Sequence, residues 1–431
     1  MKWTHVEIDK LVEEYRDEII QTTRDLVCIP SENIVPSGNE KGCQEYLLKR
    51  LDGRKADIDL FTPDEVPDLD RHEGYFPGRD YQNRPNLVVR RRGAGGGKSL
   101  VFSSHVDVVS TSQDLWPEGD HPYSGKLTDG RIYGRGAFDM KGGLISTLFA
   151  LKIISDQKLR LRGDLIFESV VDEENAGSNG TLACRVRGYN ADAAIIPEPS
   201  MLTVCPAAKG GRYYRVALRG AGGMGFGEET LVNPVYGLAT LIKGVEAYER
   251  WINTLPSMLS LYTGDENPRD VILDKVQAGD PNPGANVAVP AEAWFSIYIT
   301  SLYSEAELLD RELTDFLNRQ VQNDGFFAEQ KPLVTPLSRY LYPYQSDVNH
   351  PLVSMLAKSA RRFTGIENRV SGAHFACDGF IFHKYFNTPV YILGPRGGNA
   401  HACDEFVLAD DVVNLTKVFM AVALEWCGWN E

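Results

Sequence analysis

The chain begins with a helical spacing of apolar residues over residues 6–27. The spacing is carried by Ile8, Leu11, Val12, Tyr15, Ile19 and Leu26. It predicts one amphipathic helix, since positions three and four apart share a helix face. Further helices are predicted over residues 40–51 and 140–155, and strands over 86–91, 99–109, 164–171 and 191–196. This alternation predicts an α/β fold whose mixed, mostly parallel sheet carries helices on both faces.

The pattern changes after residue 199. Strands are predicted over residues 212–219, 275–289 and 293–300, and helices over 233–254 and 305–322. A strand over residues 390–393 and a helix over 410–427 then resume the first pattern. We therefore predict one domain from residues 1–208 and 324–431, interrupted by an inserted α+β domain over residues 209–323.

Composition limits the classes of function. The chain has 431 residues, which is long enough for two hydrophobic cores. Hydrophobic residues make up 43% and charged residues 24%, which is the balance of a folded protein rather than a disordered one. With 45 basic and 59 acidic residues the net charge is −14, and no basic block stands apart. We therefore expect no nucleic-acid partner.

Sequence features also bear on location. The longest nearly apolar stretch, residues 142–154, is too short to span a bilayer. The start of the chain is charged and lacks the apolar segment of a signal peptide. The cysteines, at positions 28, 43, 184, 205, 377, 403 and 427, never form a CxxC pair. This distribution favours reduced thiols, so we expect a cytoplasmic protein without membrane contact.

A glycine-rich run over residues 93–99, GAGGGKS, is close to a phosphate-binding loop. Arg92 stands where that motif requires glycine, and a strand follows where a helix should begin. We therefore expect a hairpin turn between the strands over residues 86–91 and 99–109.

Two motifs carry possible metal ligands near strands and turns. His105 and Asp107 are two positions apart at the end of a predicted strand, so they share one face. An imidazole there can bind a metal while the carboxylate orients it, although a structural histidine is equally compatible. Asp139 lies in a glycine-rich turn before a helix, where it can cap the helix or bridge two cations.

Three more motifs follow apolar strands. Glu173 and Glu174 follow one strand, Glu198 follows the next, and His401 lies in a glycine-rich loop after a third. One acid of a neighbouring pair can bind metal while the other remains a general base. We expect five strand ends to bring together two histidines, three carboxylates and one spare glutamate. Nitrogen and oxygen ligands without thiolate suit Zn²⁺, Mn²⁺ or Co²⁺.

These motifs resemble a known family. HVD, GRGAFDMKGG, DEENAGS, PEP and AHACDE occur in the order and at the spacing of the co-catalytic metallopeptidases. That family includes acetylornithine deacetylase, succinyl-diaminopimelate desuccinylase and aminoacylase. The resemblance covers nearly the whole chain. It implies a zinc-peptidase-like catalytic domain over residues 1–208 and 324–431, with residues 209–323 as a lid and dimerisation domain that forms a homodimer or higher homo-oligomer.

The resemblance also implies roles for individual residues. One or two divalent ions per subunit would be held by two sets of ligands that share one carboxylate. The first set is His105, Asp139 and Glu198, and the second is Asp139, Glu174 and His401. Asp107 would orient His105, and Glu173 would be the general base for a metal-activated water that cleaves a C–N bond of a small molecule.

Several positions depart from the family pattern. Met224 lies at or beside the place of a lid histidine that polarises the scissile carbonyl in relatives, and Thr300 and Phe380 stand where arginines are common. Asn286 matches the family. His374 and Arg396 are either substitute substrate contacts or exposed surface residues.

The resemblance leaves three functions open. The family default is deacylation of an N-acyl amino acid or dipeptide. The alternative is an aminohydrolase that removes an amine from an electron-poor aromatic acid such as 5-nitroanthranilate and releases ammonia. Met224 favours this alternative, because a thioether cannot donate a proton to an oxyanion but packs well against a flat ring. The third possibility is a non-catalytic binding protein, which the intact ligand set disfavours.

Overall fold

The computed structural model describes residues 4–51, 56–111, 116–117, 121–227, 229–280, 288–367 and 369–430. The chain forms two compact units. The first comprises Met1–Ala207, Gln345–Ala373 and Asp378–Glu431, and the second comprises Ala208–Tyr344 and His374–Cys377. None of the described helices combines the length and apolar character needed to cross a bilayer.

The first unit begins with two helices where the sequence predicts one. The prediction of a single helix over residues 6–27 is wrong, since α1 (His5–Glu13) ends before α2 (Arg16–Val27) begins. The amide of Tyr15 bonds to the Val12 carbonyl at 3.0 Å, which tightens the last turn and ends α1. The break lets α1 pack on α9 while α2 also contacts α4.

A nine-stranded mixed sheet forms the centre of this unit, in the order β16-β11-β18-β10-β5-β9-β4-β3, with β17 paired to β11. The strands are β3 (Asp57–Phe61), β4 (Asn86–Arg91), β5 (Leu100–His105), β9 (Leu165–Val170), β10 (Ala194–Ile196), β11 (Val204–Ala208), β16 (Tyr344–Gln345), β17 (Val370–Ala373) and β18 (Val390–Ile392). The mixed α/β class is confirmed. Parallel pairing joins β18, β10, β5 and β9, whereas β11 pairs antiparallel with β18, β4 with β9, and β3 with β4.

The expected hairpin between β4 and β5 is wrong. β9 lies between them and pairs antiparallel with β4 and parallel with β5. The glycine-rich connection instead bonds to the segment before β9, through Ala94 N to Leu161 O and Gly95 N to Arg162 O, both at 2.8 Å. The run over residues 93–99 is therefore a crossover connection between strands that are not neighbours.

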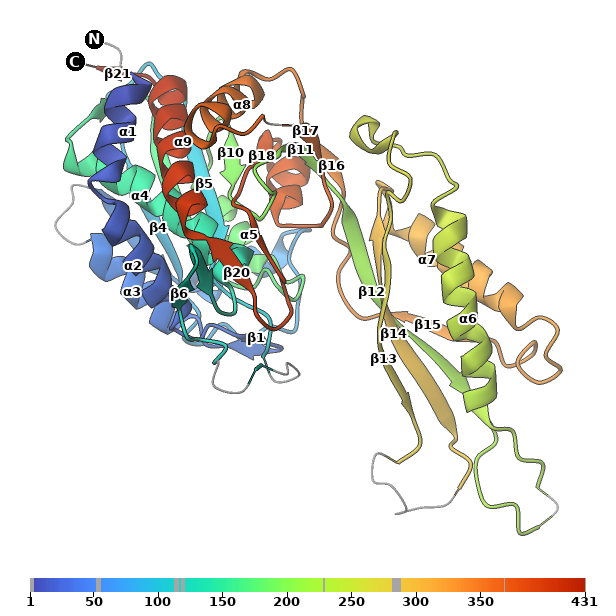
Figure 1. The fold of residues 1–431 in the computed structure, drawn as a ribbon. Helices are drawn as coiled ribbons and strands as arrows, with labels where there is room; N and C mark the ends of the chain where they lie inside the picture. Colours follow the sequence, from blue (N-terminus) through green and yellow to red (C-terminus); the bar gives the residue numbers. More distant parts are fainter. Residues whose placement is uncertain are drawn as a thin grey trace. The chain divides into compact units, whose positions relative to one another are not determined.

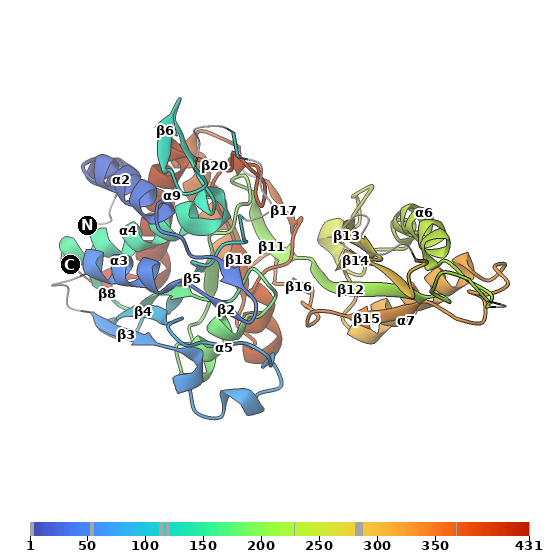
Figure 2. The ribbon, with the colours of Figure 1, turned by 90° about the horizontal axis from the view of Figure 1, so that it is seen from below.

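Helices cover both faces of the sheet, as predicted (Figures 1 and 2). On one face α4 (Gly142–Asp156) and α9 (Ala409–Cys427) pack against buried residues of β5 and β9, namely Leu100, Phe102, Leu165 and Phe167. On the other face α5 (Asn179–Val186) is joined to β9 by a buried ion pair between Arg185 and Glu168. Helices α3 (Lys41–Leu51) and α8 (Pro351–Thr364) complete the layers.

A small four-stranded sheet has the order β19-β20-β7-β6. It consists of β6 (Lys126–Thr128), β7 (Arg131–Tyr133), β19 (Gly397–Gly398) and β20 (Phe406–Leu408). Pairing of β7 with β20 joins segments that are far apart in sequence. The turn after β7 and the loop between β19 and β20 therefore lie close together. Two short pairs of strands, β1 (Asn33–Ile34) with β2 (Ser37–Gly38) and β8 (Arg160–Leu161) with β21 (Trp429–Asn430), complete the unit.

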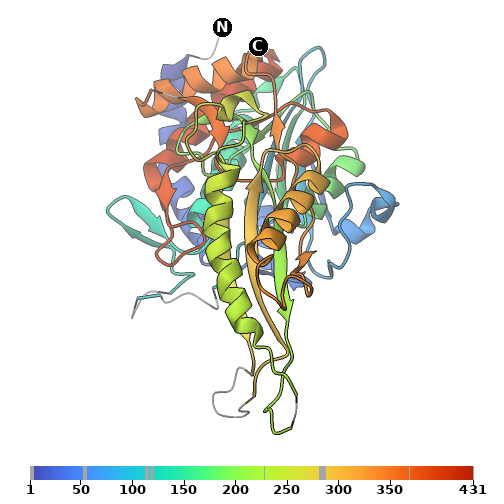
Figure 3. The same ribbon diagram turned by 90° about the vertical axis from the view of Figure 1, so that its right-hand side faces the viewer.

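The second unit is an α+β domain with one antiparallel sheet in the order β13-β14-β12-β15. Its elements are β12 (Gly210–Arg219), α6 (Pro234–Ile252), β13 (Val271–Ala278), β14 (Glu292–Ser301), α7 (Ala306–Gln320) and β15 (Leu333–Pro336). Both helices lie side by side on one face of the sheet (Figure 3). The unit extends past the expected boundary at residue 323, because β15 pairs with β12.

Candidate metal centre

Adjacent parallel strands deliver part of the site at one edge of the large sheet. His105 is the last residue of β5, Glu173 and Glu174 follow β9, and Glu198 follows β10. Because β10, β5 and β9 are parallel neighbours, their carboxyl ends meet at this edge.

Two close approaches of the backbone hold the segment that carries Glu198. A Cβ on Gly143, near the start of α4, would lie 2.0 Å from the Pro197 carbonyl oxygen. A Cβ on Gly394 would lie 2.0 Å from the Glu198 carbonyl oxygen. Only glycine fits at such distances, so Glu198 is fixed between α4 and the residues after β18.

Asp139 lies in a turn before a helix, as predicted, so it is not one of the five strand ends that the sequence also led us to expect. It lies in a tight turn over residues 137–141, between β7 and α4. Oε1 of Glu405 accepts hydrogen bonds from the amides of Phe138 (3.0 Å) and Asp139 (3.1 Å). Oε2 accepts from the Gly136 amide (3.0 Å) and from Arg135 Nη1 (2.8 Å). One buried carboxylate, which sequence reasoning did not select, therefore fixes the turn.

His401 also comes from a loop, between β19 and β20, rather than from the large sheet. Its Nε2 lies 3.0 Å from Glu174 Oε2 and 3.3 Å from Asp139 Oδ2. The side chain is 52% exposed. The negative charge of Glu174 raises the pKa of His401 well above its ordinary value.

The five predicted ligands form one continuous cluster. His105 Nε2 lies 3.2 Å from Asp139 Oδ1 and 3.6 Å from Glu198 Oε1. Single ligand atoms of His105, Asp139 and Glu174 all lie within 4.8 Å of one another. One oxygen of Asp139 faces His105 and the other faces His401, so Asp139 joins the two sets of side chains.

The chemistry of this cluster fits divalent cations. Burial raises the pKa of Glu198 and of Glu173 well above the usual range. Glu174 Oε1 is buried and has no hydrogen-bond partner among the described residues. Converging carboxylates of this kind need a compensating positive charge, and two imidazoles with carboxylates and no thiolate are ligands for zinc-type ions.

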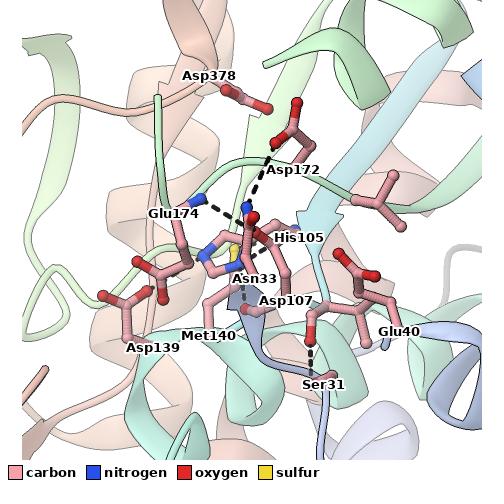
Figure 4. A network of polar contacts seen from close by, with 12 residues as sticks. Ser31, Asn33, Glu40, His105, Asp107, Asp139, Met140, Asp172, Glu174 and Asp378 are labelled. Atoms are coloured by element: carbon pink, nitrogen blue, oxygen red, sulfur yellow. Dashed lines mark hydrogen bonds and ion pairs between the residues drawn. The ribbon is translucent and has the colours of Figure 1, made fainter. Parts of the chain in front are cut away.

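The backbone, rather than the side chain, of Asp107 bonds to His105. His105 Nδ1 lies 2.9 Å from the Asp107 carbonyl oxygen and 3.7 Å from Oδ1 of its carboxylate. A carbonyl only accepts, so Nδ1 donates and Nε2 faces Asp139. Asp107 therefore orients His105 through its backbone carbonyl, and the prediction that its carboxylate does so is wrong. Oδ2 of Asp107 instead accepts from Asn33 Nδ2 (2.9 Å) and the Glu174 amide (3.0 Å) (Figure 4).

Comparison with known proteins identifies the family. Residues 101–425, most of the chain, match the profile of peptidase family M20/M25/M40. The chain belongs to this family. It is therefore a metal-dependent hydrolase of the M20 type, as the resemblance in sequence predicts.

Individual relatives extend this result. The chain is 27% identical to N-formyl-4-amino-5-aminomethyl-2-methylpyrimidine deformylase of Bacillus subtilis (strain 168), over 98% of this chain and 97% of the relative. The fold is that of the di-peptidase Dug1p from Saccharomyces cerevisiae, with a TM-score of 0.79, 14% identity and coverage of 100% of both chains. The YXEP protein of Bacillus subtilis, described as a dinuclear metal binding peptidase of the M20 family, has a TM-score of 0.60, 14% identity and coverage of 96% of this chain and 98% of its own.

A buried network supports the acidic turn of this M20 hydrolase. Asp172 precedes the two glutamates and has a positive φ of 70°. Its carboxylate accepts from Tyr81 Oη (2.6 Å) and Asn33 Nδ2 (3.4 Å) and pairs with Arg79 Nε (3.3 Å). Arg84 pairs with Glu40 close by. Arg79, Tyr81 and Arg84 come from the segment before β4, where no local pattern indicated a role, whereas Asn33 lies in β1.

The structure places the expected substrate-contact residues in different surroundings. Arg396 is paired with both carboxylate oxygens of Asp411 at 2.8 Å, in the first turn of α9, so it is not a free substrate contact. His374 and Met224 belong to the second unit, and Met224 is 48% exposed. Asn286 lies outside the described residues.

Proposed function

We propose that this M20 hydrolase cleaves the amide C–N bond of a small molecule that carries a short acyl group, such as formyl. The observation that carries the proposal is the cluster in which Asp139 faces His105 with one oxygen and His401 with the other. The deformylase relative, which matches nearly the full length of both chains, supports a short acyl group.

We assign the metal ligands in two sets, one on each side of Asp139. One ion would be held by His105, Asp139 and Glu198, and the other by Asp139, Glu174 and His401, with zinc, manganese or cobalt as the ion. When bound, such ions supply a Lewis acid that polarises a carbonyl and strengthens water as a nucleophile.

Glu173 is the general base in this proposal. Glu174 has His401 within ion-pair distance, whereas Glu173 makes no ion pair with any described residue. Its carboxylate lines the same pocket as His105 and Glu198. Glu173 takes a proton from the attacking water at a carboxylate oxygen and returns it to the leaving nitrogen, so it removes the need for an unstable amide anion.

A substrate panel tests this function. The purified protein is stripped of metal, reloaded separately with Zn²⁺, Mn²⁺ or Co²⁺, and assayed on N-formyl amines, N-acetyl amino acids, dipeptides and electron-poor aromatic amines. We expect formamides to be the best substrates. Faster turnover of dipeptides or N-acetyl amino acids would support the family default instead. Release of ammonia from 5-nitroanthranilate would support the aminohydrolase reading, which Met224 favours because a thioether donates no proton.

We also propose that the second unit mediates homodimerisation. β13 is an edge strand of its sheet, and Ile272 and Val276 on it are 53% and 50% exposed. An open edge with exposed apolar side chains favours pairing with another chain. Light scattering of the wild type and of Val276→Lys tests this, and a monomeric wild type would contradict it.

A further inference from the structure

Asp378 is a buried carboxylate that the metal cluster does not use. Its residue is 5% exposed, and Oδ2 accepts a hydrogen bond from Thr181 Oγ1 of α5. Oδ1 is also buried, and no described residue gives it a hydrogen bond of good geometry. Burial raises the pKa of Asp378 to about 6, while the nearby Ser178 and Thr181 hydroxyls lower it. At neutral pH the side chain is therefore mainly ionised.

This carboxylate lines a small pocket of about 10 Å³ beside the metal cluster, which is room for a group about the size of a water molecule. The pocket is lined by Ser103, Ser104, His105, Val170, Glu173, Thr181, Ile196, Glu198 and Asp378. Among these described residues there is no lysine or arginine. Figure 4 shows Asp378 with the surrounding polar network. The pocket therefore has room for a compact head group, such as an ammonium, next to Glu173 and Asp378.

The arginines near the site are engaged with other carboxylates. The pairs are Arg79 with Asp172, Arg84 with Glu40, Arg135 with Glu405, Arg185 with Glu168, and Arg396 with Asp411. Divalent cations at the cluster would be balanced by their own carboxylate ligands and Glu173. Asp378 has a hydroxyl partner in Thr181 but would keep an uncompensated charge, and a buried carboxylate without a counter-charge is costly.

We propose that Asp378 binds a positively charged amino group on the substrate, and so selects N-acyl amines that carry a second, cationic nitrogen. This inference rests on the proposed function, because it assumes that the scissile amide lies between Glu173 and the metal cluster. An ammonium group matches Asp378 in charge and donates to Oδ1. A substrate carboxylate at the same place would be repelled, which disfavours ordinary N-acyl amino acids in this orientation.

A purely structural role for Asp378 predicts something different. Thr181 lies in the first turns of α5, so the carboxylate could act only as an anchor for that helix. An anchor would affect the stability of the fold but would not distinguish a cationic ligand from a neutral ligand of the same size.

Binding of a matched pair of ligands separates these roles. N-formylethylenediamine and N-formylpropylamine have nearly the same size, but only the first carries an ammonium group. Their affinities are measured by calorimetry on zinc-loaded Glu173→Gln and Glu173→Gln/Asp378→Asn proteins. Glu173→Gln prevents turnover and removes the neighbouring free carboxylate, so the difference between the two proteins measures the contribution of Asp378. The asparagine retains an oxygen that can accept from Thr181.

We expect the ammonium ligand to bind about 10- to 100-fold more tightly than the neutral ligand when Asp378 is present, as for a hydrogen bond to a charged group. The preference should disappear with Asp378→Asn, at unchanged zinc content. Equal affinities in the Glu173→Gln protein, or a preference that survives Asp378→Asn, would overturn the inference. The first comparison needs no variant at Asp378, so the test stands even if that variant does not fold. Failure of the wild type to hydrolyse any formamide would contradict the proposed function, whereas the binding ratio still decides the role of Asp378.

Discussion

Replacing Glu405 with glutamine should weaken both the fold and the metal centre, although Glu405 lies outside the proposed ligand set. Its two oxygens accept hydrogen bonds from four donors in and before the turn that precedes α4: the Arg135 guanidinium and the amides of Gly136, Phe138 and Asp139. Glutamine can keep one oxygen toward Phe138 and Asp139. Its amide nitrogen would then face the two remaining groups, which are both donors.

The size of the effect follows from burial. The Arg135 and Glu405 side chains are each 1% exposed, so the substitution leaves a buried guanidinium without its counter-charge. Breaking one side of a buried ion pair costs about 3–5 kcal/mol. The turn also positions Asp139, and loss of a residue that orients a metal ligand lowers metal affinity about 10- to 100-fold.

Two measurements check this prediction, with Glu425→Gln as the control. Glu425 is an exposed glutamate on α9 in the same unit, so the control repeats the chemical change without the buried contacts. Urea unfolding gives the change in free energy, and competition with a chromophoric chelator gives the zinc affinity. If Glu405→Gln unfolds within about 0.5 kcal/mol of the control, the range of ordinary surface substitutions, and binds zinc equally well, the role assigned to Glu405 is refuted.

Three further outcomes are expected. Glu173→Gln should abolish turnover with metal content nearly unchanged, whereas Glu174→Gln should lose metal. The reason is that Glu174 contacts His401, while Glu173 has no ion-pair partner among the described residues. Equal loss of metal in the two variants would mean that their roles are exchanged. Arg396→Ala should lower the free energy of unfolding by about 1–3 kcal/mol, because the buried Asp411 loses its counter-charge and keeps only the backbone amide of residue 396. KM should change less than about twofold, and a large rise in KM would restore Arg396 as a substrate contact. Removal of metal by a chelator should lower the Tm and activity together, both restored by a divalent ion, since the cation compensates buried carboxylates.

The sequence predicted those parts of the site that follow simple strand geometry. An apolar run that ends in His105, or in the acids after β9 and β10, indicates a side chain at the carboxyl edge of a parallel sheet. The core helices α4 and α9 were predicted within a few residues for the same reason, because their periodicity is local.

Other features depend on contacts between distant segments. The hairpin expected at residues 93–99 failed because β9, which comes much later in the chain, takes the position between β4 and β5. The boundary at residue 323 was placed too early because β15 is recognised as part of the second sheet only through its pairing with β12. No local pattern of polar and apolar residues contains such pairings.

Two charged residues near the site show why residue type alone does not predict which charges a ligand can contact. From the sequence, Arg396 is a candidate substrate contact or an exposed residue, and nothing selects Asp378 as a binding residue. In the structure Asp411 neutralises Arg396, whereas no described residue neutralises Asp378. The charge available to a ligand is the charge left after internal pairing, and at Asp378 that charge is negative. The site should therefore prefer cationic ligands, because Asp378 has no counter-charge among the described residues. Reversing this preference would require a variant that neutralises Asp378 itself, rather than one that only adds an arginine nearby.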